Sequence, residues 1–244
     1  MFAKFHGFVG TALAVCIGAS IASRAEGAVQ LPGNRVVEKV DFERHIMGLF
    51  GRMGCNSGSC HGSFQGKGGF RLSLFGYEPE KDYLAVTREG LARRVIASDP
   101  DNSLLLLKAT GQVEHGGAVR FSKDTWQYRV FKEWMQEGGR WTKGSGDVKK
   151  ITITPPEYAF KKPGESVELK VTATFADGSN ADITAFCDFR TNDDAVAEVS
   201  NLGEIRALRA GNTAIVVSYR GNVLPVRLLV PMELPHGFAY PKIP

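Results

Sequence analysis

Residues 55–61 read CNSGSCH, and this short run determines what the surrounding region has to be. Two cysteines followed at once by a histidine are what covalent haem attachment requires, because two thiols add to the haem vinyl groups while the imidazole reaches the iron. The usual motif has two residues between the cysteines, whereas four separate Cys55 from Cys60. A disulfide between Cys55 and Cys60, with His61 merely adjacent, is the alternative that the run leaves open.

The segments around this run predict a small helical domain. The apolar residues before it recur at helical spacing: Phe42, Ile46, Leu49, Phe50 and Met53. Asp41 is placed to cap that helix, which leads directly into Cys55. Short helices are expected at 82–90 and 101–110, and a last one opens at Asp124 and ends at Gly138. An opening helix, a cysteine and histidine run, loops and a closing aromatic helix are typical of a small c-type cytochrome domain, over residues 38–143.

An iron held by His61 takes a second axial ligand or keeps an open site. The side chains that offer a ligand are His115, Met135, Met47, Met53 and His45. Met135 and His45 are interpreted as core and surface residues, and Met53 stands too close to the attachment run. His115 lies in a glycine-containing loop that can lie flat against a ring, so we expect it to be the distal ligand, with a solvated loop histidine as the alternative.

After the Gly144-Ser145-Gly146 stretch, the helical spacing of apolar residues gives way to an alternation with a period of two. Residues 148–154, 166–175 and 213–219 alternate apolar and polar side chains, with turns between them. Several short strands at even spacing predict an all-β antiparallel sandwich over 148–231. Cys187 is expected there as a small buried hydrophobe.

Composition and the N-terminus set the compartment. The 244 residues carry 30 Lys and Arg against 26 Asp and Glu, interspersed along the chain, so we expect no nucleic-acid partner. Residues 1–28 are predicted as an export signal, because Lys4 precedes an apolar stretch and small residues follow. That stretch is too short to favour a membrane span, so an exported protein, periplasmic or at the cell surface, is expected, with no transmembrane span in the mature chain.

Several segments together resemble one family. They are Gly54–Gly62, Gly66–Leu74, Leu107–Gln112 and His115–Gly117, and they are similar to the large modular cytochrome c proteins of planctomycetes and related bacteria. The resemblance implies one haem c bound through Cys55 and Cys60 with His61 as the proximal ligand, and the wide cysteine spacing is a trait of this subgroup. It also implies that the haem domain is followed by a bacterial immunoglobulin-like domain.

The β-rich part carries its own resemblance. Residues 196–203 and 211–215 are similar to the bacterial immunoglobulin-like group 2 fold. The expected fold class is therefore multi-domain, an all-α cytochrome c-like domain followed by an all-β immunoglobulin-like sandwich. Residues 232–244 are expected to be a linker or truncated tail, because the resembled proteins continue into further domains.

The chain departs from the family at one iron ligand. Related planctomycete domains place a methionine in a Met-Pro-Pro loop before the closing helix, and His115 stands in the matching place here. This favours bis-histidine coordination, which generally lowers the reduction potential. Arg71 or Arg120 is expected to neutralise the haem propionates, because a partly buried carboxylate needs a cation.

Three functions follow from these observations. The first is an exported electron-transfer module with one covalent haem, an electron carrier rather than an enzyme, which acts with a redox partner protein or with further domains of a larger polypeptide. The second is a haem sensor or peroxidase-like enzyme with an open iron, in which His115 is an acid or base. The third is a haem-free surface adhesion or carbohydrate-binding protein with a Cys55 to Cys60 disulfide.

Overall fold

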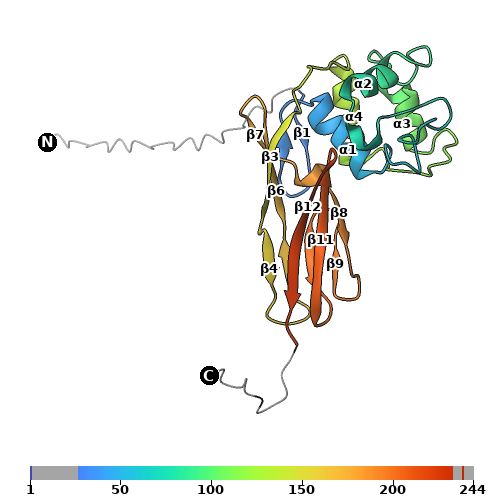
Figure 1. The fold of residues 1–244 in the computed structure, drawn as a ribbon. Coiled ribbons are helices and arrows are strands. Elements are labelled where there is room, and N and C mark those ends of the chain that lie inside the picture. The colour runs from blue at the N-terminus through green and yellow to red at the C-terminus, as the bar shows by residue number, and fades with distance from the viewer. Residues whose placement is uncertain (2–26, 233–237, 239–244) are drawn as a thin grey trace.

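The computed structural model describes residue 1, residues 27–232 and residue 238. Most of the expected export signal at 1–28 and of the expected tail at 232–244 lies outside the described residues. The rest forms a compact helical part beside one end of an elongated β-rich part (Figure 1). No helix in the described part of the chain is long and apolar enough to cross a membrane.

The helical part is built from short elements. Within residues 27–143 they are β1 (Val29–Gln30), β2 (Val36–Val37), the π-helix η1 (Phe42–Ile46), α1 (Met47–Arg52), the 3₁₀ turns η2 (Leu74–Gly76) and η3 (Pro100–Asn102), α2 (Pro79–Thr87), α3 (Leu104–Ala109) and α4 (Trp126–Gln136). Strands β1 and β2 pair antiparallel just ahead of the expected helical domain. Long irregular segments join the four described α-helices, so the helical part is less regular than the all-α expectation.

Local sequence explains where its main helices begin and end. The Asp41 carboxylate accepts a hydrogen bond from Arg44 N at 2.8 Å, which confirms the expected cap, although the first turn is a π-helix. Helix α4 begins after Thr125 rather than at Asp124. Its apolar face is buried, and it ends as expected at Gly138, which adopts a left-handed φ of 91°.

The β-rich part is the expected sandwich. Its strands are β3 (Val148–Thr154), β4 (Glu157–Ala159), β5 (Ser166–Glu168), β6 (Lys170–Phe175), β7 (Asn180–Asp182), β8 (Asp188–Thr191), β9 (Ala197–Val199), β10 (Glu204–Ala207), β11 (Gly211–Tyr219) and β12 (Asn222–Val230), with the 3₁₀ turn η4 (Thr184–Phe186) before β8. They form sheets ordered β3-β6-β7, β4-β12-β11-β8 and β5-β10-β9. Their pairing is antiparallel as expected except at one edge, where β12 pairs parallel to β4. The strand predicted over 166–175 is split at Leu169, because β5 pairs with β10 while β6 pairs with β3.

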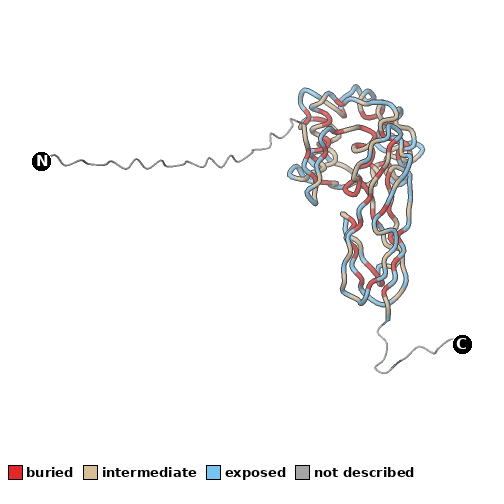
Figure 2. The backbone as a smooth tube through the Cα atoms, turned by 90° about the vertical axis from the view of Figure 1, so that its left-hand side faces the viewer, coloured by how far each residue is buried: buried red, intermediate tan, exposed pale blue. Residues whose placement is uncertain are grey.

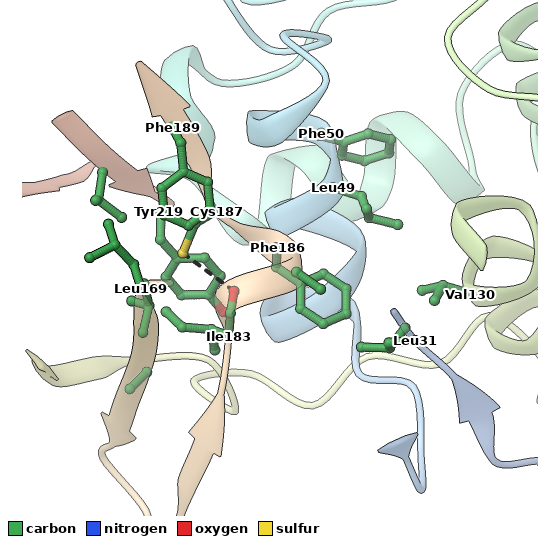
Figure 3. Packing of buried hydrophobic residues seen from close by; sticks show 14 of the residues in the cluster. Leu31, Leu49, Phe50, Val130, Leu169, Ile183, Phe186, Cys187, Phe189 and Tyr219 are labelled. Carbon is green, nitrogen blue, oxygen red and sulfur yellow. Dashed lines mark hydrogen bonds between the residues drawn. The ribbon is translucent and has the colours of Figure 1, made fainter. Parts of the chain in front are cut away.

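The two parts share one hydrophobic core. Buried segments run through both of them (Figure 2). Helix α1 packs on Phe186 and Tyr219, and a Cβ added at Gly48 would lie 3.1 Å from the Tyr219 ring and 3.2 Å from Phe186 Cβ. Figure 3 shows Phe186 between α1 and the sandwich, and Cys187 buried as a small hydrophobe with its thiol 3.3 Å from Ile183 O. The close fit at Gly48 fixes the distance between helix and sandwich.

Charged side chains complete this junction. The buried Glu43 carboxylate accepts hydrogen bonds from Trp141 Nε1 at 2.7 Å, from Gly144 N at 2.8 Å and from Gly146 N at 3.0 Å. It also lies 3.4 Å from Arg220 Nη2, in the turn between β11 and β12. One carboxylate of the helical part therefore holds the linker and the sandwich together.

His45 was expected at the surface, and this was wrong. Its Nδ1 accepts a hydrogen bond from Asp41 N at 2.8 Å, and its ring lies 4.9 Å from the Phe186 ring. Burial lowers the pKa of His45 to about 3. The helical periodicity placed His45 opposite Phe42, but the sandwich covers that side as well.

Candidate functional site

A cavity of about 400 Å³ opens in the helical part between α1, α3, α4 and the loops that follow α1 and α3. Its apolar wall includes Phe50, Leu104, Leu105, Ala109 and Phe131 from helices and Phe121 from the loop before α4. The loops supply Cys55, Cys60, His61 and His115. A cavity of this size and lining is typical of sites for organic ligands.

Backbone hydrogen bonds fold the run 55–61 back on the end of α1. Cys55 N donates to Phe50 O at 2.8 Å, and His61 N donates to Cys55 O at 2.9 Å. The turn closes so tightly that a Cβ at Gly62 would lie 2.0 Å from Asn56 O. This turn brings both thiols and the imidazole to one wall of the cavity despite the four-residue cysteine spacing.

Both histidines of the cavity are held in the same way. His61 Nδ1 lies 3.0 Å from Phe70 O, and His115 Nδ1 lies 3.0 Å from Ala118 O. A backbone carbonyl at Nδ1 fixes the tautomer that leaves Nε2 as a ligand atom, an arrangement that accompanies most metal-binding histidines.

The two imidazoles face each other across the cavity. Their ring centres are 6.2 Å apart and their planes differ by 6°. Imidazole nitrogens bind metals at about 2 Å, so two imidazoles on opposite sides of one ion have centres about 6 Å apart. Two such rings beside two thiols in an apolar cavity fit the donor set of a covalently attached haem. Within residues 27–232 no three His, Cys, Asp or Glu side chains group closely enough to hold a metal ion by themselves.

Burial favours the uncharged forms of the Cys55 thiol and the His61 imidazole. Desolvation raises the pKa of the Cys55 thiol to about 12, against the opposing charge of Arg120. Desolvation also lowers the pKa of His61, against its hydrogen bond to Phe70 O. A neutral imidazole is the form that binds metals.

Of the two arginines expected at the cofactor carboxylates, Arg120 lines the cavity and Arg71 does not. Arg120 lines the cavity, with Nη2 3.8 Å from Cys60 Sγ. Arg71 is not among the lining residues, and its guanidinium lies 5.5 Å from the Phe64 ring centre.

Sequence reasoning missed four other cations of the cavity lining, which are Lys67, Arg93, Arg94 and Lys108. Arg94 is buried and donates to Ala85 O at 2.7 Å and to Gly69 O at 2.6 Å, with its charge 4.5 Å from the Phe70 ring centre. It thereby supports the turn that ends at Phe70, whose carbonyl oxygen contacts His61 Nδ1. No periodicity marks these residues, although the paired arginines beside the leucine-rich helix were a visible signal.

The methionines are also placed differently from one another. Met53 lines the cavity, although its position just before Cys55 had argued against this. The turn at Gly54, with φ of 70°, reverses the chain and lets the side chain reach inward. Met47 and Met135 are buried in the core, as expected for Met135, and are not among the lining residues.

Comparisons with known proteins bear on the β-rich part. A search of curated proteins finds no match to the chain. Residues 147–221 match the family model of the bacterial Ig-like domain (group 2), in agreement with the observed sandwich. The β-rich part of the chain is therefore a bacterial Ig-like domain of group 2.

Proposed function

We propose that the protein is an exported electron-transfer module with one haem c in the 400 Å³ cavity, attached through Cys55 and Cys60 and ligated by His61 and His115. The observation that carries the proposal is the histidine pair. Two imidazoles from separate loops are parallel within 6°, 6.2 Å apart, each with Nδ1 on a backbone carbonyl.

The residues of the chain have distinct tasks in this proposal. The carbonyls of Phe70 and Ala118 orient the two imidazoles. Phe50 and Phe131 exclude water from the apolar wall, and Arg120 offers a positive charge to cofactor carboxylates. A haem with two histidine ligands supplies one-electron transfer without an open coordination site.

The Ig-like domain serves as a rigid support in this proposal. Helix α1 packs on Tyr219 and Phe186 at one end and leads into Cys55 at the other. The sandwich therefore fixes the wall that carries the attachment run. An Ig-like domain packed on the helical part suits a protein outside the cytoplasm that presents the cavity to a redox partner or to further domains of a longer polypeptide.

The test is expression of the full chain in a periplasm that attaches haem, followed by an intact mass and a visible spectrum. The expected mass exceeds that of the mature polypeptide by one haem, and the expected spectrum is that of a low-spin, six-coordinate iron. Cys55→Ala with Cys60→Ala removes the mass increase. A bare polypeptide mass would overturn the proposal in favour of a haem-free surface protein.

His115→Ala tests the distal ligand separately. The variant is expected to give a high-spin or ligand-accepting iron, while the control His45→Gln, a histidine outside the cavity lining, keeps the low-spin spectrum. A low-spin six-coordinate iron in His115→Ala would assign the distal position to another residue. A high-spin iron in the unaltered protein would favour the open-site sensor or peroxidase-like function.

A further inference from the structure

A second cavity, of about 230 Å³, lies between the helical part and the sandwich. It is lined by Arg52, Met53, Val119, Arg120, Gln127, Cys187, Asp188, Phe189 and Asn201. Arg120 and Met53 also line the first cavity, so these two side chains form the wall between the cavities. Clefts between domains are frequent ligand sites.

Arg52 brings a partly buried charge to this cavity from the end of α1. Its Nη1 donates to Cys187 O at 3.0 Å, and its guanidinium lies 5.6 Å from the Trp126 ring centre. In the described part of the chain the guanidinium makes no other hydrogen bond, and burial lowers its pKa. A desolvated cation of this kind gains from an anionic partner.

Arg120 brings a second charge from the other side. Its backbone N donates to Ala109 O at 2.8 Å, which fixes the residue in the loop before α4. Within residues 27–232 its guanidinium makes no ion pair, and its polar contact is the 3.8 Å approach to Cys60 Sγ. Its planar fork of donors suits a carboxylate.

The acidic side chain of this lining does not balance the two arginines. Asp188 is paired with Arg190 Nε at 2.7 Å, and Arg190 does not line the cavity. The Asp188 charge also acts on Arg52, so it is shared between two arginines. Gln127 and Asn201 add amide groups to the same space. The cavity therefore presents two arginine forks and two amides against one carboxylate that already has a partner.

From this arrangement we infer that the second cavity binds a carboxylate between Arg52 and Arg120. The carboxylate has two sources, a propionate of a haem in the adjoining cavity or a small carboxylate from solution. The first source rests on the proposed function, and the second does not. In either case Arg120 couples the occupant of the junction cavity to the thiol wall of the first cavity.

Calorimetric titration of the full-length protein with succinate tests this inference, in its haem-loaded and its haem-free form. Succinate binding to both forms identifies a free carboxylate as the occupant, and binding only to the haem-free form identifies the propionate. Arg52→Gln or Arg120→Gln is expected to weaken the binding about tenfold or more, since each removes charge-assisted hydrogen bonds.

Matched controls separate the site from general charge. Arg129→Gln removes an exposed arginine of α4 that does not line the cavity and is expected to leave succinate binding unchanged. Succinamide, which has the same chain without charge, is expected not to bind. Circular dichroism checks that each form is folded, and Arg120→Gln serves where loss of the Arg52 bond to Cys187 O disturbs the junction. Absence of succinate binding in both folded forms, or binding by both variants as tight as by the unaltered protein, would overturn the inference.

Discussion

The cavity loops and the Glu43 network at the junction with the sandwich are held by different kinds of contact. In the loops, the bonds that order His61 and His115 come from residues nine and three positions away. At the junction, Glu43 binds partners 98 to 177 positions away. Hydrogen bonds between residues close in sequence order a loop locally, whereas hydrogen bonds between distant residues stabilise the whole fold. Substitutions in the two regions should therefore separate function from stability.

The largest effect is expected for Glu43→Ala. Glu43 is 1 % exposed and the side chain of its partner Arg220 is 7 % exposed. The variant leaves the buried Arg220 charge without its carboxylate and the donors at Trp141, Gly144 and Gly146 without an acceptor. Removal of one partner of a buried pair costs about 3–5 kcal/mol of unfolding free energy. Urea unfolding measures it.

The control is Glu157→Ala, which breaks the exposed pair with Arg227 and should cost no more than about 0.5 kcal/mol. Equal losses in the two variants would show that the junction network adds nothing beyond a surface ion pair.

A smaller loss is expected for Gly48→Leu. The Cβ alone comes within 3.2 Å of both Phe186 and Tyr219, so the larger side chain overpacks the junction and costs about 1–3 kcal/mol. Gly51 lies on the same helix with nothing within 4 Å of an added Cβ. Gly51→Ala should stabilise the protein by about 0.5–1 kcal/mol through helix propensity. Thermal unfolding of both variants gives the comparison, and a stable Gly48→Leu protein would mean that the sandwich can move away from α1.

The third effect depends on pH and appears at His45. The folded protein keeps this histidine neutral down to pH about 3, while the unfolded chain protonates it near its ordinary pKa of 6.5. Stability from His45 is therefore complete above pH 6.5 and falls as the pH is lowered, by about 2 kcal/mol between pH 7 and pH 5. Urea unfolding of the unaltered protein and of His45→Gln at both pH values measures the difference, and parallel pH profiles would contradict the burial of His45.

Asp82, near the cavity loops, changes the free energy of unfolding in the opposite direction when the pH is lowered. Burial raises its pKa to about 6, against the hydrogen bonds from Ser73, so acidification from pH 7 to pH 5 protonates the folded form first. This adds about 1 kcal/mol over the same interval. Asp82→Asn removes this contribution. In the unaltered protein the contributions of Asp82 and His45 to the pH dependence of stability partly cancel.

The same contrast explains what the sequence predicts. Cys55, Cys60 and His61 are adjacent in the chain, and the alternating strands and the amphipathic α4 follow from short-range patterns. His115 was predicted as a site residue because the two glycines that follow it mark a loop between two helices, and the structure places it in the lining of the cavity. Arg93, Arg94 and Lys108 reach the cavity only after α3 has folded over it, so no spacing signals them. His45 and the break at Leu169 depend on which surface packs against which, and a pattern within one element does not contain that information.

Gly48 has one further consequence. A helix seated this closely on Tyr219 and Phe186 leaves no room for water at this contact, so the apolar surfaces that meet there are buried only when the two parts are packed together. Cooperativity then extends across the linker, and the two parts gain or lose their order in a single transition. The Ig-like domain is therefore not exchangeable for an arbitrary sandwich, because a replacement has to present a matching aromatic pair to Gly48.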